Sequence, residues 1–134
     1  MLAVDTNIVV RLLTEDDPQQ AAAAKRIFSS GPVWIPKTVF LETAWVLESV
    51  YSFKESAIQD AFSSLLGYEN VYTEDATSMR DALALCGHGI ELADAIHLTS
   101  RPPGTRFASF DRKLIRSANA AGVSNVVNGL FEPE

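Results

Sequence analysis

Two aspartates end segments that are predicted to be strands. Asp5 follows the apolar run 2–4, and Asp111 follows the strand-forming run 107–110. In a parallel α/β sheet, ligands bind beyond the carboxyl ends of the strands. Both carboxylates are therefore expected at the ligand-binding edge of a sheet. Taken singly, either residue could instead be the N-cap of the helix that follows, because Asp is among the residues preferred there.

Two further acids interrupt apolar stretches. Glu42 lies within residues 39–47, whose pattern predicts a buried helix, and Asp94 lies within residues 92–96. An ionised carboxylate among apolar neighbours costs several kcal/mol unless a cation compensates it. Glu42 could bond a buried backbone group or a distant Arg, and Asp94 could lie on a polar helix stripe with Glu91.

A divalent cation would explain all four acids together. Four like charges at two strand ends and in two apolar helices have no evident basic partners beside them in the sequence. Carboxylate oxygens are hard ligands suited to Mg²⁺ or Mn²⁺, which also bind phosphate oxygens. Two histidines and one cysteine give little support to a zinc site.

Length, composition and charge limit the class of protein. The chain has 134 residues, 47% of them hydrophobic, which predicts one globular domain over residues 1–134. It shows neither a signal peptide nor an apolar run of membrane-spanning length, so a cytoplasmic protein is expected. The net charge of −6 argues against simple nucleic-acid binding, but residues 101–116 carry a net +4 around Asp111. That run is either a phosphate-facing surface or a solvated helix face.

Strands and helices are predicted to alternate along the chain. Asp17-Pro18 is a helix start, Ser52 to Glu55 matches a capping box, and Gly122 suits a helix end. Strands are expected at 2–4, 33–35, 70–72, 107–110 and 126–127. Helices are expected at 18–28, 38–51, 52–66, 91–100 and 111–120, with another ending at Cys86 and capped by Asp75. This alternation predicts an α/β fold with a parallel sheet.

Four sequence blocks together resemble the PIN-domain nucleases. They are Asp5-Thr6-Asn7 after the first strand, Glu42 in the helix after Pro36, Ala93 to His97 around Asp94, and Ser109 to Leu114 around Asp111. The resemblance covers nearly the whole chain and preserves the order and spacing of the four acids. It is nearest to the VapC toxins of bacterial toxin–antitoxin pairs.

The resemblance implies a three-layer sandwich with a central parallel sheet flanked by helices. It also implies cleavage of RNA that depends on Mg²⁺ or Mn²⁺, a homodimer, and a cognate antitoxin that inhibits the enzyme. Asp5 and Asp94 match the principal metal ligands and Asp111 a further ligand. Glu42 matches a ligand through water, or a base that orients that water. All four acids are therefore the expected catalytic residues.

Two rival functions remain open at this stage. A phosphatase of the haloacid dehalogenase type also places an Asp after its first strand, but it needs a second Asp two residues later, where this chain has Asn7. A non-catalytic PIN-like module that holds RNA or a protein would not need all four acids. Metal-dependent nuclease activity distinguishes these functions from the expected one.

Overall fold

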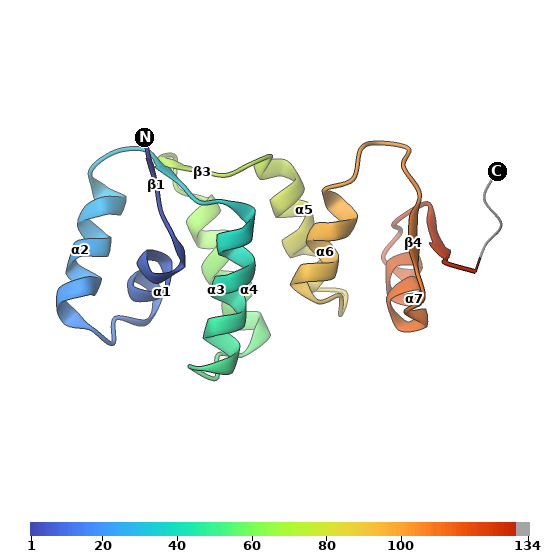
Figure 1. The fold of residues 1–134 in the computed structure, drawn as a ribbon, viewed down its shortest axis with the longest axis horizontal. Coiled ribbons are helices and arrows are strands. Elements are labelled where there is room, and N and C mark those ends of the chain that lie inside the picture. The colour runs from blue at the N-terminus through green and yellow to red at the C-terminus, as the bar shows by residue number, and fades with distance from the viewer. Residues whose placement is uncertain (131–134) are drawn as a thin grey trace. The chain divides into compact units, whose positions relative to one another are not determined.

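The computed structural model of the protein describes residues 1–130, and the chain divides into two compact units. Unit 1 is Met1–Arg80 and unit 2 is Asp81–Glu134, so the boundary falls within helix α5 (Ala76–Cys86). Figure 1 shows unit 1 in blue to green and unit 2 in yellow to red. The prediction of a single domain over residues 1–134 stays a prediction, and its last four residues lie outside the described part.

Unit 1 is built on a three-stranded parallel sheet. Its strands are β1 (Leu2–Ala3), β2 (Val33–Trp34) and β3 (Val71–Tyr72), in the order β1-β2-β3. Val33 is fully buried at the centre of this sheet. The parallel arrangement places the carboxyl ends of all three strands at one edge, and β1 ends two residues before Asp5.

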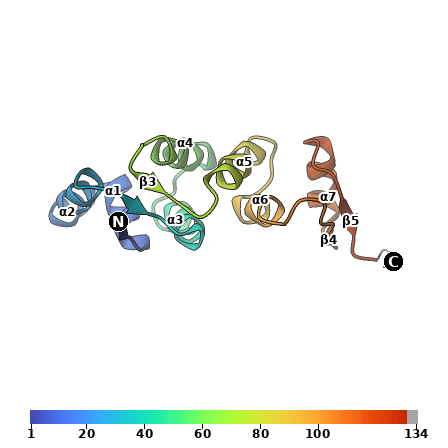
Figure 2. The same ribbon diagram turned by 90° about the horizontal axis from the view of Figure 1, so that it is seen from above.

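Four helices complete the core of unit 1: α1 (Thr6–Thr14), α2 (Pro18–Ser29), α3 (Lys37–Ser49) and α4 (Glu55–Leu66). Helix α1 packs against both α2 and α3. Seen from above, α3 and α4 lie on either side of β3 (Figure 2). The rings of Phe40 and Phe62, both fully buried, meet edge to face with centroids 5.0 Å apart and fasten α3 to α4.

Unit 2 combines helices with a second parallel strand pair. It contains α6 (Leu92–Thr99), β4 (Phe107–Ser109), α7 (Arg112–Ala120) and β5 (Val126–Asn128), and α7 packs on both strands. Figure 2 shows α7 beside these two strands. Arg101 donates hydrogen bonds to the carbonyls of Leu98 and Ser124, which ties the end of α6 to the loop before β5. The expected α/β fold with parallel sheet and flanking helices is confirmed.

Several local signals in the sequence are confirmed as structure. The Asp17 carboxylate accepts a hydrogen bond from the Gln20 amide at 3.0 Å, so it caps α2 with Pro18 at the first helical position. Gly122, with φ +82°, follows the end of α7 in the left-handed region, as a C′ glycine does. Cys86 ends helix α5, as predicted, and is buried.

The predicted capping box at Ser52 is wrong. Helix α4 begins only at Glu55, its N-cap is Lys54, and no side chain caps it. Ser52 instead adopts φ +57°, and the Phe53 amide donates to the Leu47 carbonyl six residues earlier. The amide of Phe53 therefore bonds back to the last turns of α3, so the segment closes α3 rather than opening α4.

Helix α1 was not predicted as a separate element. Its segment follows the first strand directly and lacks a distinct break before Asp17, and its last turn ends at Glu15 in the left-handed region, with φ +56°. Within residues 1–130, no helix is both long and apolar enough to cross a membrane.

Candidate active site

Asp5 stands where the sequence predicts, just beyond the end of β1, and it also caps a helix. Its Oδ1 atom accepts a hydrogen bond from the Asn7 amide at 3.1 Å, which makes Asp5 the N-cap of α1. The side chain is exposed. Capping and metal binding do not compete here, because the bond to Asn7 uses only one of the two carboxylate oxygens.

Glu42 is held by a hydroxyl from the neighbouring helix. The Thr6 Oγ1 hydroxyl, in the first turn of α1, donates a short hydrogen bond to Oε1 of Glu42 in α3. Thr6 is buried, whereas Glu42 is exposed. Asp5 and Glu42 are therefore linked through adjacent residues of one chain segment, because Thr6 directly follows Asp5.

The expectation that Glu42 lies in a fully buried helix is wrong. Only Phe40, Thr43 and Leu47 of α3 are buried, and their spacing of three and four residues places them on one face. Trp45, within the run 39–47 whose pattern predicts a buried helix, is 66% exposed. Helix α3 therefore buries only one face despite its apolar composition, and Glu42 is exposed.

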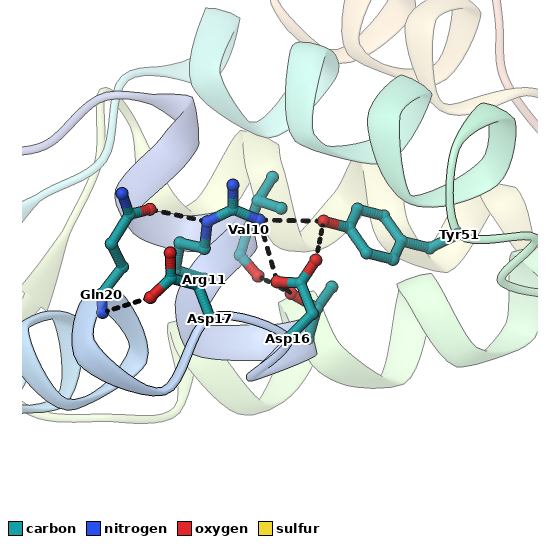
Figure 3. Close-up of polar contacts among 7 residues, drawn as sticks. Val10, Arg11, Asp16, Asp17, Gln20 and Tyr51 are labelled. Carbon is teal, nitrogen blue, oxygen red and sulfur yellow. Dashed lines mark hydrogen bonds and ion pairs between the residues drawn. The ribbon is translucent and has the colours of Figure 1, made fainter.

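A polar network fixes the other end of the α1–α3 contact (Figure 3). Arg11, in the last turn of α1, donates hydrogen bonds to Asp16 Oδ1 at 2.8 Å and to the Tyr51 hydroxyl at 2.9 Å. The Tyr51 hydroxyl, just beyond α3, donates in turn to Asp16 Oδ2 at 2.6 Å. Arg11 also reaches Gln20 of α2. Thr6 and Arg11 thus hold α1 to the α3 segment near both ends of the shorter helix.

The same network shifts two pKa values. The hydrogen bond to Tyr51, supported by the attraction of Asp16, raises the pKa of Arg11. The hydrogen bond from Tyr51, with those from Thr14 and Arg11, lowers the pKa of Asp16. Sequence reasoning missed this network, since Tyr51 lies 35 residues or more from both partners.

Asp94 and Asp111 line one small pocket in unit 2. Its volume is about 90 Å³, and it lies between the start of α6 and the first turns of α7. The residues that line it are Gly89, Ile90, Glu91, Asp94, Asp111, Lys113, Leu114 and Ser117. The structure therefore brings together two of the four predicted carboxylates, although 17 residues separate them in the sequence.

The two carboxylates of this pocket differ in the hydrogen bonds that they accept from the protein. Asp111 caps α7, with Oδ1 accepting from the Leu114 amide at 3.1 Å, and its own amide donates to Ser109 Oγ at 3.0 Å. Asp94 is half-buried, and within residues 1–130 its side chain has no hydrogen bond or ion pair. His97, one turn after Asp94, is exposed and does not line the pocket.

The pocket of unit 2 offers two carboxylates to a ligand. Mg²⁺ keeps several waters and binds proteins through one or two carboxylates, and both Asp94 and Asp111 line this pocket. Among the described residues, no three His, Cys, Asp or Glu side chains form a group able to hold a metal. The four-carboxylate site therefore stays a prediction, of which one pair is seen in a shared pocket.

A comparison with protein families gives the class of protein. The model of the PIN domain family matches residues 2–120, and the chain therefore belongs to the PIN domain family. PIN domains are generally nucleases that use divalent metal ions, so a nuclease-type function follows for this chain. The comparison with curated proteins gives no match.

Proposed function

We propose that this protein is an endoribonuclease dependent on Mg²⁺ or Mn²⁺, the toxin of a toxin–antitoxin pair. The observation that carries the proposal is the pocket in which Asp94 and Asp111 lie together, in a chain of the PIN family. Asp5, Asp94 and Asp111 are the proposed metal ligands, and Glu42 is the fourth catalytic carboxylate. A bound cation would supply a water that is nucleophilic at neutral pH and a polarised phosphodiester.

The residues of the chain have distinct roles in this reaction. Asp94 offers both oxygens, and Asp111 offers the oxygen that does not cap α7. Glu42 accepts the Thr6 hydroxyl on Oε1, which leaves Oε2 available to bind the attacking water or to accept its proton. Water attacks the phosphorus and the 3′ oxygen leaves, so the products carry a 5′ phosphate and a 3′ hydroxyl.

The rival functions have weaker support. Asn7, which stands where a haloacid dehalogenase phosphatase needs its second Asp, contributes a backbone amide to the Asp5 cap. A non-catalytic module would have no use for an unpaired Asp94 beside Asp111. Both rivals predict that RNA remains intact with any divalent metal.

The test is a cleavage assay with single-stranded RNA in Mg²⁺ or Mn²⁺ and in EDTA, with analysis of the product ends. We expect metal-dependent cleavage and 5′ phosphates. Cleavage that survives exhaustive chelation, or products with 2′,3′-cyclic phosphates, would remove the metal mechanism. Transfer RNA, ribosomal RNA and messenger RNA are each tested as the substrate in this assay.

The proposed partners are RNA, a second copy of the chain in the cytoplasm, and an inhibitory antitoxin. Unit 1 offers the antitoxin an apolar groove of about 360 Å³ between α1, α2 and α4. Leu12, Leu13, Phe28 and Leu65 are among its lining residues, and Tyr68 beside them is 59% exposed. An amphipathic helix of a small protein suits such a groove.

Co-expression with the product of the neighbouring gene tests this partner. Ala61 lines the groove, so Ala61→Glu introduces a charge there and is expected to weaken the complex without reducing RNA cleavage. Single Ala replacements of the partner's C-terminal Arg and Lys test whether a cation also enters the acidic pocket. A complex indifferent to Ala61→Glu would place the partner elsewhere, and light scattering of the chain alone tests the homodimer.

A further inference from the structure

Lys113 is the basic residue among the described residues that line the acidic pocket of unit 2. It shares that pocket with three carboxylates, those of Glu91, Asp94 and Asp111. Lys113 lies in the first turn of α7, two residues after the Asp111 cap, and Ser117 lies one turn further along the same helix face. Sequence patterns alone do not distinguish this lysine from the other cations of residues 101–116.

The ammonium group of Lys113 is not committed to any of these acids. The ion pairs Arg11–Asp16 and Lys25–Glu15 lie in unit 1, and among the described residues none is found that involves Lys113. Lys113 therefore lies near three anions without being within 4.0 Å of a carboxylate oxygen of any of them. A lysine at the edge of an acidic pocket, with its charge unpaired, is able to bind an anion that enters.

We propose that Lys113 is a substrate-binding residue that holds a phosphodiester oxygen of RNA against the Asp94–Asp111 pair. The inference rests on the proposed nuclease function and names a further residue of the same site. Lysine binds phosphate as a compact point charge with three rotatable donors. It offsets the repulsion that three carboxylates exert on an incoming phosphate, and it weakens their attraction for a metal ion.

This role predicts effects of opposite sign on the two ligands. Removal of the positive charge strengthens the attraction of the pocket for a cation and weakens its attraction for a phosphate. A purely structural lysine predicts something different, because loss of the local fold would weaken both. Measurement of both the metal affinity and the RNA affinity therefore distinguishes a phosphate-binding lysine from a structural one.

The experiment compares three variants of the full chain. Lys113→Gln removes the charge, and Lys113→Arg keeps it. Arg116→Gln is the matched control, because it removes the same charge from an exposed residue of α7 that does not line the pocket. Calorimetry measures Mn²⁺ affinity, fluorescence anisotropy in EDTA measures binding of an RNA oligonucleotide, and initial rates give KM and kcat for cleavage.

We expect Lys113→Gln to bind Mn²⁺ roughly three- to tenfold more tightly and RNA roughly tenfold more weakly, mainly through KM. Lys113→Arg is expected to stay within about threefold of the wild type for both ligands. Weaker binding of both ligands by Lys113→Gln, or equal effects of Arg116→Gln, would overturn the proposal. If the wild type cleaves no RNA, the proposed function fails, whereas the two binding measurements still decide the role of Lys113.

Discussion

The two units differ in how completely hydrogen bonds engage their acidic residues. In unit 1, Glu42 accepts the Thr6 hydroxyl and Asp5 accepts the Asn7 amide, so both carboxylates are oriented by hydrogen bonds. In unit 2, Asp94 and Asp111 share a pocket, and Asp111 accepts the Leu114 amide, but within residues 1–130 the Asp94 side chain has no polar partner. Both carboxylates of unit 1 are thus held by the protein, whereas unit 2 contains one carboxylate, Asp94, with both oxygens unused.

This difference suggests a division of work between the pairs. A carboxylate without protein partners is free to bind a cation, because no internal bond must be broken first. A carboxylate fixed by a neighbouring hydroxyl is suited to orient a water, since its free oxygen has a defined direction. Variants in unit 2 should therefore abolish metal binding, and variants around Glu42 should reduce turnover more than metal affinity.

The largest effect is expected from Asp94→Asn and Asp111→Asn. Each removes a proposed ligand, and loss of even an outer partner of a ligand commonly costs 10- to 100-fold, so RNA cleavage should fall by roughly 100-fold or more. Asp81→Asn, on exposed residue 81 of unit 2, is the matched control. Cleavage rates in saturating Mn²⁺ and thermal melts measure both properties. A well-folded Asp94→Asn protein with wild-type turnover would show that Asp94 is not an essential ligand.

An intermediate effect is expected from Thr6→Val, which keeps the shape of the buried side chain and removes its hydroxyl. Turnover should fall roughly 10- to 100-fold because Glu42 loses the donor that orients it, whereas Mn²⁺ affinity should change less than about threefold. Thr6→Ser restores the donor and is expected to recover most of the activity. If Thr6→Ser is as impaired as Thr6→Val, the hydroxyl is not what matters.

A smaller effect, on stability alone, is expected from Tyr51→Phe. The variant removes a hydroxyl that accepts from Arg11 and donates to Asp16, so the free energy of unfolding should fall by about 1 kcal/mol. Denaturant unfolding measures this change. Because the network also fixes α1 against the α3 segment, turnover is expected to fall less than with Thr6→Val. An equal or larger loss of turnover would show that the Arg11–Tyr51–Asp16 network is part of the active site.

The smallest effect is expected on the melting temperature at acidic pH. Tyr51 lowers the pKa of Asp16, and a carboxylate with a lowered pKa stabilises the fold above its unfolded pKa of about 3.9. That contribution is lost as the pH falls through the lowered value. The difference in melting temperature between wild type and Tyr51→Phe should therefore narrow as the pH falls from about 5 through the lowered pKa of Asp16. A difference that stays constant across this range would show that Asp16 is not stabilised by Tyr51.

Local sequence signals predicted most of the elements, with helix α1 as an exception, and the position of Asp5 and Asp111 just beyond two strands. Asp5 and Asp111 lie at the ends of β1 and β4, and both are also helix N-caps, so the structural and functional interpretations of these residues are compatible. The strand ends and caps depend on neighbouring residues, which the sequence displays directly. The PIN resemblance is likewise confirmed at the level of the family.

Features that depend on distant contacts could not be predicted. Thr6 and Glu42 are 36 residues apart, and Arg11 and Tyr51 are 40 apart, so no local pattern pairs them. The apolar composition of residues 39–47 predicts a buried helix, but only one face of α3 is packed and Trp45 is exposed. Ser52 matches a capping box, yet in the turn after α3 it adopts the left-handed conformation instead.

The central claim is that the Asp94–Asp111 pair binds the catalytic cation, and paramagnetic broadening by Mn²⁺ tests it most directly. In heteronuclear spectra of the full chain, substoichiometric Mn²⁺ should first broaden the amide signals of residues that line the unit 2 pocket, with those around Asp5 if it is a ligand. Asp94→Asn should abolish the effect. Broadening that spares the segments around Asp94 and Asp111, while cleavage still depends on Mn²⁺, would contradict the account.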